Sequence, residues 1–208
     1  MFEPKVFFDN VRGVPKAPGI LGPTLEPGEV AGCNALLATC EGWPISWTAY
    51  AMATAYHETK GTMLPIHEDG SRNYFMRNYD PSGQKPAVAR DLGNTVVGDG
   101  ARFHGRGYVQ LTGRRNYAKA GAELGVDLVA NPDRALEPEI AAQILRAGMS
   151  QGWFTGKDLA DYLPASGKVS AAAYIPARRI INGTDKAQTI AGYAVQFQNA
   201  LWDAGWRP

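Results

Sequence analysis

The sequence predicts a mainly α fold, in which helices pack as a bundle around one central buried helix, with a single small irregular β element. Two observations carry this prediction. Residues 45–59 are apolar almost all the way round the helix they would form, which is typical of a helix at the centre of a fold. Strand signals are few and gather near residues 61–80, whereas helical spacing of apolar residues recurs along the chain.

Helices are expected between the clusters of glycine and proline. Residues 1–28 carry five prolines and four glycines and should be mostly irregular. Residues 61–83 should be irregular or a hairpin, and the glycine-rich residues 93–107 should be a loop. Thr112 is a candidate N-cap for the helix that follows it. The expected helices run from residue 29 to the break at Gly42 and over residues 45–59, 84–93, 113–124, 138–151, 157–163, 170–181 and 186–204.

Length, composition and charge exclude several classes of protein. The 208 residues suffice for a real hydrophobic core, and 45% hydrophobic and 20% charged residues are ordinary values for a globular protein. A net charge of +1 argues against a nucleic-acid binder. No apolar run approaches 18 residues, and no basic region followed by an apolar run opens the sequence. We therefore expect neither stable membrane insertion nor a secretory signal.

The two cysteines are not expected to form a disulfide. Cys33 and Cys40 lie seven positions apart on one face of a predicted helix, a rise of about 10 Å. That separation is too long for a disulfide, so two buried free thiols are expected.

Glu58 is the first candidate for chemistry, because it ends the most apolar helix of the chain. A carboxyl group there loses solvation, and burial favours its protonated form, which a general acid for glycosidic cleavage needs. Glu68 follows ten residues later in a polar, irregular segment and should stay ionised, with Asp69 beside it. One protonated and one ionised carboxyl group make the pair that glycoside hydrolysis uses. By themselves, an exposed helix end and two acids close in sequence explain the same residues without any chemistry.

No metal or other cofactor is predicted. His57-Glu58 begins a zinc-protease pattern, but that pattern needs a second histidine at position 61, which is glycine. His67 and His104 have no ligand spacing, so structural or hydrogen-bonding roles are expected for all three histidines.

The segment 103–117 is the most informative part of the chain. Its glycines at 105 and 107 fit neither a dinucleotide fingerprint nor a phosphate loop, but they let the backbone approach a ligand. The neutral hydrogen-bonding groups that follow suit a sugar or a catalytic water, although a turn into a capped helix explains the pattern equally well. These groups are Tyr108, Gln110, Thr112 and Asn116. In residues 178–184, Asn182-Gly183 is explained by a helix C-cap alone.

Three ordered motifs together resemble the family 19 glycoside hydrolases, the chitinase-like branch of the lysozyme superfamily, and in particular its bacteriophage endolysins. They are His-Glu-Thr at 57–59, Gly-Arg-Gly-Tyr-Val-Gln-Leu-Thr at 105–112 followed by Asn116-Tyr117, and Ile-Ile-Asn-Gly at 180–183. The resemblance covers about residues 30–204. It implies a lysozyme-like α+β fold with a cleft between two lobes. Residues 1–208 would then form one catalytic domain without a separate wall-binding module, with room for a small helical lobe within 113–165.

The resemblance also implies roles for individual residues. Glu58 would be the general acid. Glu68 is the better match for the base that activates water, with Asp69 as the alternative. Thr112 would hold that water. Such an enzyme inverts the anomeric centre, with the carboxyl groups about 6.5–9.5 Å apart. The positions matched to sugar binding or to organisation of the site are His57, Arg106, Tyr108, Gln110, Asn116 and Asn182.

The motifs do not distinguish chitin from peptidoglycan, since both contain β-1,4-linked N-acetylated sugars. The lack of a signal and of a disulfide framework favours a monomeric endolysin of muramidase type that acts on the peptidoglycan glycan strand. It would remain in the host bacterial cytoplasm until a holin-like protein permits its release to the cell wall. The alternatives are a chitinase, a non-catalytic carbohydrate-binding protein and, least favoured, a zinc-dependent amidase or peptidase.

Overall fold

The computed structural model describes residues 1–14 and 16–207, and it confirms the mainly α class that the sequence predicts. The described residues divide into two compact units, residues 1–64 with 145–208 and residues 65–144. In chain order the elements are α1 (Pro4–Arg12), β1 (Gly13–Val14), β2 (Ala17–Pro18), α2 (Pro27–Thr39), α3 (Ile45–Glu58), β3 (Ile66–His67), α4 (Arg72–Tyr79), α5 (Pro86–Asp91), α6 (Asp99–Arg102), β4 (Arg106–Gly107), α7 (Arg114–Leu124), η1 (Pro132–Leu136), α8 (Pro138–Ser150), α9 (Ala171–Tyr174), η2 (Ile175–Ile180) and α10 (Ala187–Asp203).

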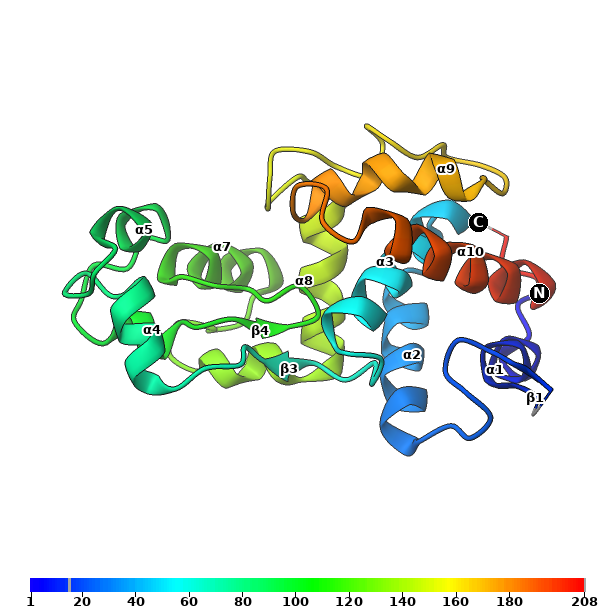
Figure 1. Cartoon of the computed structure of the whole chain (residues 1–208), viewed down its shortest axis with the longest axis horizontal. Helices are drawn as coiled ribbons and strands as arrows, with labels where there is room; N and C mark the ends of the chain where they lie inside the picture. Colours follow the sequence, from blue (N-terminus) through cyan, green and yellow to red (C-terminus); the bar gives the residue numbers. More distant parts are fainter. Residues whose placement is uncertain (15, 208) are drawn as a thin grey trace. The chain divides into compact units, whose positions relative to one another are not determined.

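Helix α3 is the centre of the first unit, as predicted. Most of its residues are buried, and several are alanines, which let other helices approach closely. Helix α10 packs along α3 and also contacts α1 and α9 (Figure 1). Aromatic edges extend this contact, since the Tyr56 ring meets Tyr193 at 4.9 Å and Phe197 at 6.1 Å between centroids.

The end of α3 fixes the position of Glu58. The hydroxyl of Thr59 donates to the Ala55 carbonyl at 2.8 Å and accepts from the Met63 amide at 3.1 Å, which satisfies backbone groups at the helix end. Gly61 then has φ +88°, a left-handed conformation that turns the chain out of the helix. Glu58 therefore lies in the last turn of a buried helix.

In the second unit, two buried aspartates hold the loop before α6. Asp80 accepts from the amides of Gly98 at 2.8 Å and Gly100 at 3.1 Å, and Asp99 forms a two-pronged ion pair with Arg114. Burial opposes ionisation of Asp99, but the hydrogen bonds from Arg114 and from the amides of residues 95 and 96 outweigh it and lower the pKa of this carboxyl group. The loop that leads into α6 is thus anchored by charge-assisted bonds.

Two segments expected to be irregular contain helices. Residues 4–12 form α1, because Pro4 stands in the first turn, where its missing amide costs no hydrogen bond. Residues 72–79 form α4, which begins at Ser71, whose hydroxyl accepts from the Tyr74 amide at 3.2 Å. The expected β element is present, but the partner of β3 is β4, in antiparallel register with His67 opposite Arg106.

Three further expectations were wrong in detail. The loop predicted over residues 93–107 contains α6 and β4. Residues 157–163 form turns, in which the Asp158 carboxylate accepts from the amides of residues 160 and 161 and competes with a helix. Thr112 does not cap α7, because the cap position is Gly113, at φ +91°.

The remaining helix predictions are confirmed, with residues 170–181 divided between α9 and η2. Cys33 and Cys40 are both buried and free, and burial raises the pKa of each thiol to about 12. Among the described residues, no helix combines the length and the apolar composition of a membrane span.

Candidate active site

Glu58 has a cationic partner that the sequence did not reveal. The Nη1 of Arg178, in η2, donates to Oε1 of Glu58 at 2.8 Å. The Arg178 side chain is 5% exposed and that of Glu58 is 21% exposed. The Nε of Arg178 donates to the Asp185 carbonyl at 3.0 Å, which fixes the orientation of the guanidinium. Glu58 therefore lies in a partly buried ion pair, and the preference for its protonated form stays a prediction.

His57 and Asn182 belong to the same unit as this pair. The His57 ring is partly buried, and burial, helped by the charge of Arg178, lowers the pKa of the imidazole below 6.5. Asn182 is exposed in the turn after η2, where its amide donates to the Arg178 carbonyl at 3.0 Å. Both residues are thus linked to the surroundings of Glu58, and their predicted contacts with a sugar stay predictions.

Glu68 follows β3 and is held by two uncharged donors. The Tyr79 hydroxyl donates to Oε1 at 2.6 Å, and the Gly105 amide donates to Oε2 at 3.0 Å. The Glu68 amide in turn donates to the Gly105 carbonyl at 2.8 Å. Burial and the hydrogen bond to Glu68 together raise the pKa of the Tyr79 hydroxyl, which therefore keeps its proton and remains a donor. Asp69 is exposed, so the arrangement favours Glu68 as the second acid.

The backbone of the glycine-rich segment approaches the Glu68 side chain closely, as the glycines in its sequence predicted. A Cβ atom on Gly105 would lie 2.8 Å from Oε1 of Gln110 and 3.0 Å from Oε2 of Glu68, so a larger residue would displace one of them. Gln110, at φ +52°, donates through Nε2 to the Gly107 carbonyl at 3.1 Å. The backbone carbonyl of Gln110 accepts a hydrogen bond from the Thr112 hydroxyl at 2.8 Å. The hydrogen of the Thr112 hydroxyl is used in this bond, whereas the lone pairs of its oxygen can still accept a hydrogen bond from a water.

Asn116 and Arg106 act on this segment as supports. Asn116 donates to the Thr112 carbonyl at 2.7 Å. Arg106 is almost fully buried and donates to Asp133 at 2.8 Å and to the Tyr117 hydroxyl at 3.0 Å, which agrees with a structural role. Tyr108 is the exception among the predicted residues, because its side chain is completely buried. It packs in the core and is not placed to contact a sugar.

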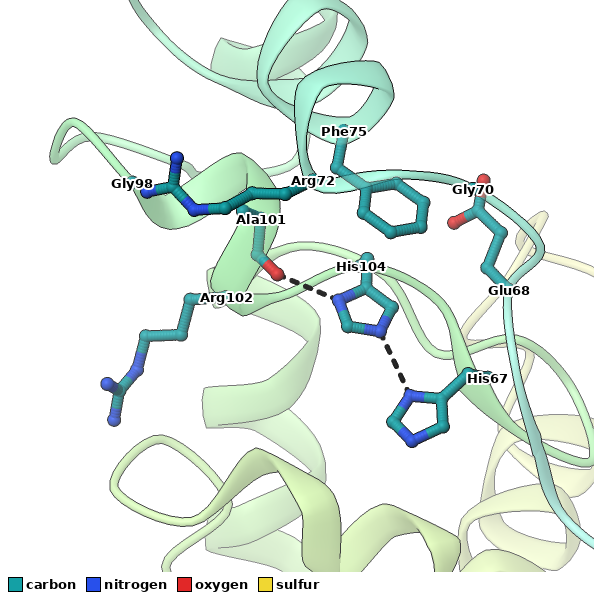
Figure 2. A pocket seen from close by; sticks show the side chains of 9 residues that line it. All are labelled: His67, Glu68, Gly70, Arg72, Phe75, Gly98, Ala101, Arg102 and His104. Carbon is teal, nitrogen blue, oxygen red and sulfur yellow. Dashed lines mark hydrogen bonds between the residues drawn. The ribbon is translucent and has the colours of Figure 1, made fainter.

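Glu68 also lines a cavity of about 530 Å³ that the sequence did not predict. The larger side chains of its lining are those of Glu68, Arg72, Phe75, Arg102, His67 and His104 (Figure 2). His67 Nδ1 lies 3.0 Å from His104 Nε2, and His104 Nδ1 lies 2.7 Å from the Ala101 carbonyl. Burial lowers the pKa of His104. Within the described part of the chain, no group of three or more His, Cys, Asp or Glu side chains is placed to hold a metal ion.

The structure thus gathers Glu68, Gln110, Thr112 and Asn116 around one backbone segment of the second unit. Glu58 and its neighbours belong to the first unit. The separation of the two carboxyl groups stays a prediction. The residues that the sequence reasoning missed are Tyr79, Arg178, Arg72 and Phe75. The signal available for Arg178 was its position two residues before the Ile-Ile-Asn-Gly motif.

Comparison with known proteins finds a family whose sequence model matches most of this chain. The family model described as chitinase class I, for glycoside hydrolase family 19, matches residues 46–196. Acidic endochitinase Q of Nicotiana tabacum is 59% identical over 77 residues, which are 37% of this chain and 23% of that protein. Chitinase 3 of Oryza sativa subsp. japonica is 31% identical over 83 residues, 39% of this chain and 26% of that protein. The matched stretches therefore span about a quarter of these relatives.

Solved structures agree with the fold. Chitinase C from Streptomyces griseus HUT6037 superposes with a TM-score of 0.58 at 19% identity, covering 95% of this chain and 75% of that one. A bacterial family 19 chitinase superposes with a TM-score of 0.51 at 19% identity, covering 97% of this chain and 94% of that one. At these identities the likeness supports the predicted lysozyme-like fold and carries no further conclusion.

Proposed function

We propose that this chain is an endolysin that hydrolyses β-1,4 glycosidic bonds of bacterial peptidoglycan. The chain belongs to the class I chitinase family, glycoside hydrolase family 19, and the proposal proceeds from that membership. Glu58 protonates the leaving oxygen, and Glu68 deprotonates a water on the opposite face of the sugar. Thr112 positions that water. The reaction inverts the anomeric centre, as expected when a water enters between two carboxyl groups.

The observation that carries the proposal is the setting of Glu68. A general base must be ionised, oriented and reachable by water. Both Glu68 oxygens accept hydrogen bonds from uncharged donors, and the side chain lines an open cavity. Neutral donors hold the carboxylate in one orientation without a counter-ion that would compete for its charge.

Glu58 supplies the complementary half of the reaction. When a general acid gives up its proton, negative charge develops on its own carboxyl group. Arg178, fixed by its bond to the Asp185 carbonyl, donates to the oxygen that gains this charge. A donor already in place for developing charge is the arrangement that accelerates such steps.

A family 19 chitinase is the second candidate, because the plant relatives are named as endochitinases. We favour peptidoglycan because Cys33 and Cys40 are buried free thiols rather than part of a disulfide framework. On this proposal the monomeric enzyme stays in the host cytoplasm until a holin-like partner permits its passage to the wall. A purely carbohydrate-binding role is disfavoured because both candidate acids are present.

Parallel digestion of purified peptidoglycan and chitin oligomers tests the proposal, with the new ends identified by mass spectrometry. New reducing ends of N-acetylmuramic acid are the expected product. Products from chitin alone would establish the chitinase alternative. Free amino groups without new reducing ends would indicate amide cleavage, and absence of any product from either polymer would leave the binding protein.

A further inference from the structure

We propose that the cavity beside Glu68 binds a sugar whose substituent carries a carboxylate, the feature that distinguishes N-acetylmuramic acid from N-acetylglucosamine. The inference rests on the proposed glycan hydrolysis and specifies which sugar this part of the site takes. The carboxylate belongs to the lactyl group itself where the glycan carries no peptide, and to the stem peptide where one is attached.

The cavity has the size and the wall of a small-ligand site. Its volume of about 530 Å³ falls within the usual range for ligand pockets, about 300–1,000 Å³. Three rings lie in a row along it. Phe75 and His104 stack with centroids 4.5 Å apart and planes 8° apart, and His104 and His67 stack at 5.3 Å and 26°. Stacking and hydrogen bonds restrain these rings, so the wall is formed before any ligand arrives.

Hydrogen bonding along this row leaves one ring nitrogen for a ligand. A carbonyl oxygen only accepts, so Nδ1 of His104 donates to Ala101. When His104 is neutral, its Nε2 accepts, and Nδ1 of His67 is the donor. His67 is exposed, and its Nε2 has no hydrogen-bond partner among the described residues. In a neutral ring with Nδ1 as the donor, Nε2 is an acceptor, which suits a hydroxyl or amide N–H group of a sugar.

Arg72 provides the cationic group of the cavity. It is exposed, and its guanidinium has no hydrogen-bond partner within residues 1–14 and 16–207. Arg102, by contrast, donates to the carbonyls of Val129 at 2.9 Å and Ala130 at 2.8 Å, and Figure 2 shows it directed away from the rings. Arg72 is therefore the guanidinium available for a two-pronged bond to a carboxylate.

The charges are arranged so that an acidic sugar would bind in one direction. In Figure 2 the Arg72 guanidinium and the Glu68 carboxylate lie on opposite sides of the Phe75 ring. Glu68 repels an anion placed beside it, so the acidic substituent would lie toward Arg72 and the neutral ring toward Glu68. A chitin sugar has no charged group to pair with Arg72, whereas a muramyl glycan carries one on its lactyl group or on its stem peptide.

Binding to the full chain carrying Glu58→Gln tests this inference without hydrolysis. Calorimetry compares chitotetraose with a peptide-free tetrasaccharide of alternating N-acetylglucosamine and N-acetylmuramic acid, and with the same glycan bearing stem peptides. We expect the acidic glycans to bind about tenfold more tightly at low salt, the effect of one hydrogen-bonded charge pair. A preference for the peptide-free or for the peptide-bearing glycan identifies the source of the carboxylate.

Arg72→Gln should remove most of this preference. Arg77→Gln should keep it, because Arg77 is an exposed arginine of the same helix outside the cavity lining. Arg72→Lys should restore part of it, which separates lost charge from altered folding. Equal affinity for neutral and acidic glycans, or equal losses in the two glutamine variants, would overturn the inference. Binding is measured apart from cleavage, so failure to digest peptidoglycan would refute the proposed function and leave the subsite result standing.

Discussion

Replacement of Glu58 by glutamine separates the chemistry of this residue from its part in the fold. Glutamine has nearly the same volume, and its carbonyl can still accept from Nη1 of Arg178, which now lies 2.8 Å from Oε1. Breaking a fully buried ion pair costs about 3–5 kcal/mol. Glu58 is 21% exposed and one hydrogen bond survives the change, so we expect a loss of about 1 kcal/mol in the free energy of unfolding.

The expected loss of activity is much larger. A positioned general acid contributes about 10²–10⁴-fold to rate. At about 1.4 kcal/mol per factor of ten, this is about 2.8–5.6 kcal/mol of activation free energy. A loss of about 1 kcal/mol in stability leaves a typical domain almost entirely folded. The two effects are therefore separable by size.

The assay measures release of reducing ends from peptidoglycan, alongside chemical unfolding of the same preparation. Glu41→Gln, an exposed glutamate of the same unit, is the matched control and should keep full activity. Turnover near that of the unchanged chain would refute the assignment of Glu58 as the acid. A loss of activity that merely followed the unfolded fraction would refute the catalytic reasoning as well.

Three other predictions follow from the described contacts. Asp99→Ala should lower the free energy of unfolding by about 2–3 kcal/mol in urea titration, because it removes the hydrogen bonds from Arg114 and from two backbone amides, while Arg114 stays 31% exposed to water. Gly105→Ala should lower turnover about tenfold to a hundredfold while leaving a folded protein, because its Cβ displaces Glu68 or Gln110. Thermal stability should fall as the pH drops below 6.5, because burial lowers the pKa of His104, so the unfolded chain binds more protons there.

These predictions have distinct controls. Asp91→Ala changes an exposed aspartate of the same unit and should leave stability nearly unchanged. For Gly105, an unaltered turnover would show that the close contact with Glu68 is unimportant. For the pH effect, a flat melting temperature between pH 7.5 and 5.5 would contradict it; Asp99, whose pKa is lowered from 3.8, loses its contribution only at more acidic pH.

The sequence predicted best where local pattern alone decides structure. Helix α3 was predictable because no surface helix is apolar all round, and the tight packing at Gly105 was predictable because only glycine brings a backbone so close to other groups. Helix α4 was missed because its glycine- and asparagine-rich surroundings suggested turns, although Ser71 was an N-cap signal. Tyr108 was misassigned because hydrogen-bonding capacity does not reveal which face of a segment is buried.

Hydrogen-bonding partners that are distant in sequence could not be predicted, for a different reason. Arg178 lies 120 positions after Glu58, and Tyr79, the last residue of α4, donates to a carboxylate 11 positions before it. Composition and periodicity describe a residue's own segment and say nothing of the segment that packs against it. The candidate acids were therefore predictable as residues, whereas the groups that set their environments were not.

The two candidate acids lie in different electrostatic environments. The base must be charged before the reaction, and Glu68 accepts from Tyr79 and Gly105, uncharged donors that stabilise a carboxylate already present. The acid must become charged during the reaction, and Arg178 places a full positive charge where that carboxylate forms. If the roles were exchanged, the cation would stabilise the reactant form of the base and slow removal of a proton from water. Arg178 also favours the ionised form of Glu58 in the free enzyme, so the assignment of Glu58 as the acid and Glu68 as the base rests on the matched motifs and stays a prediction, which Glu58→Gln tests.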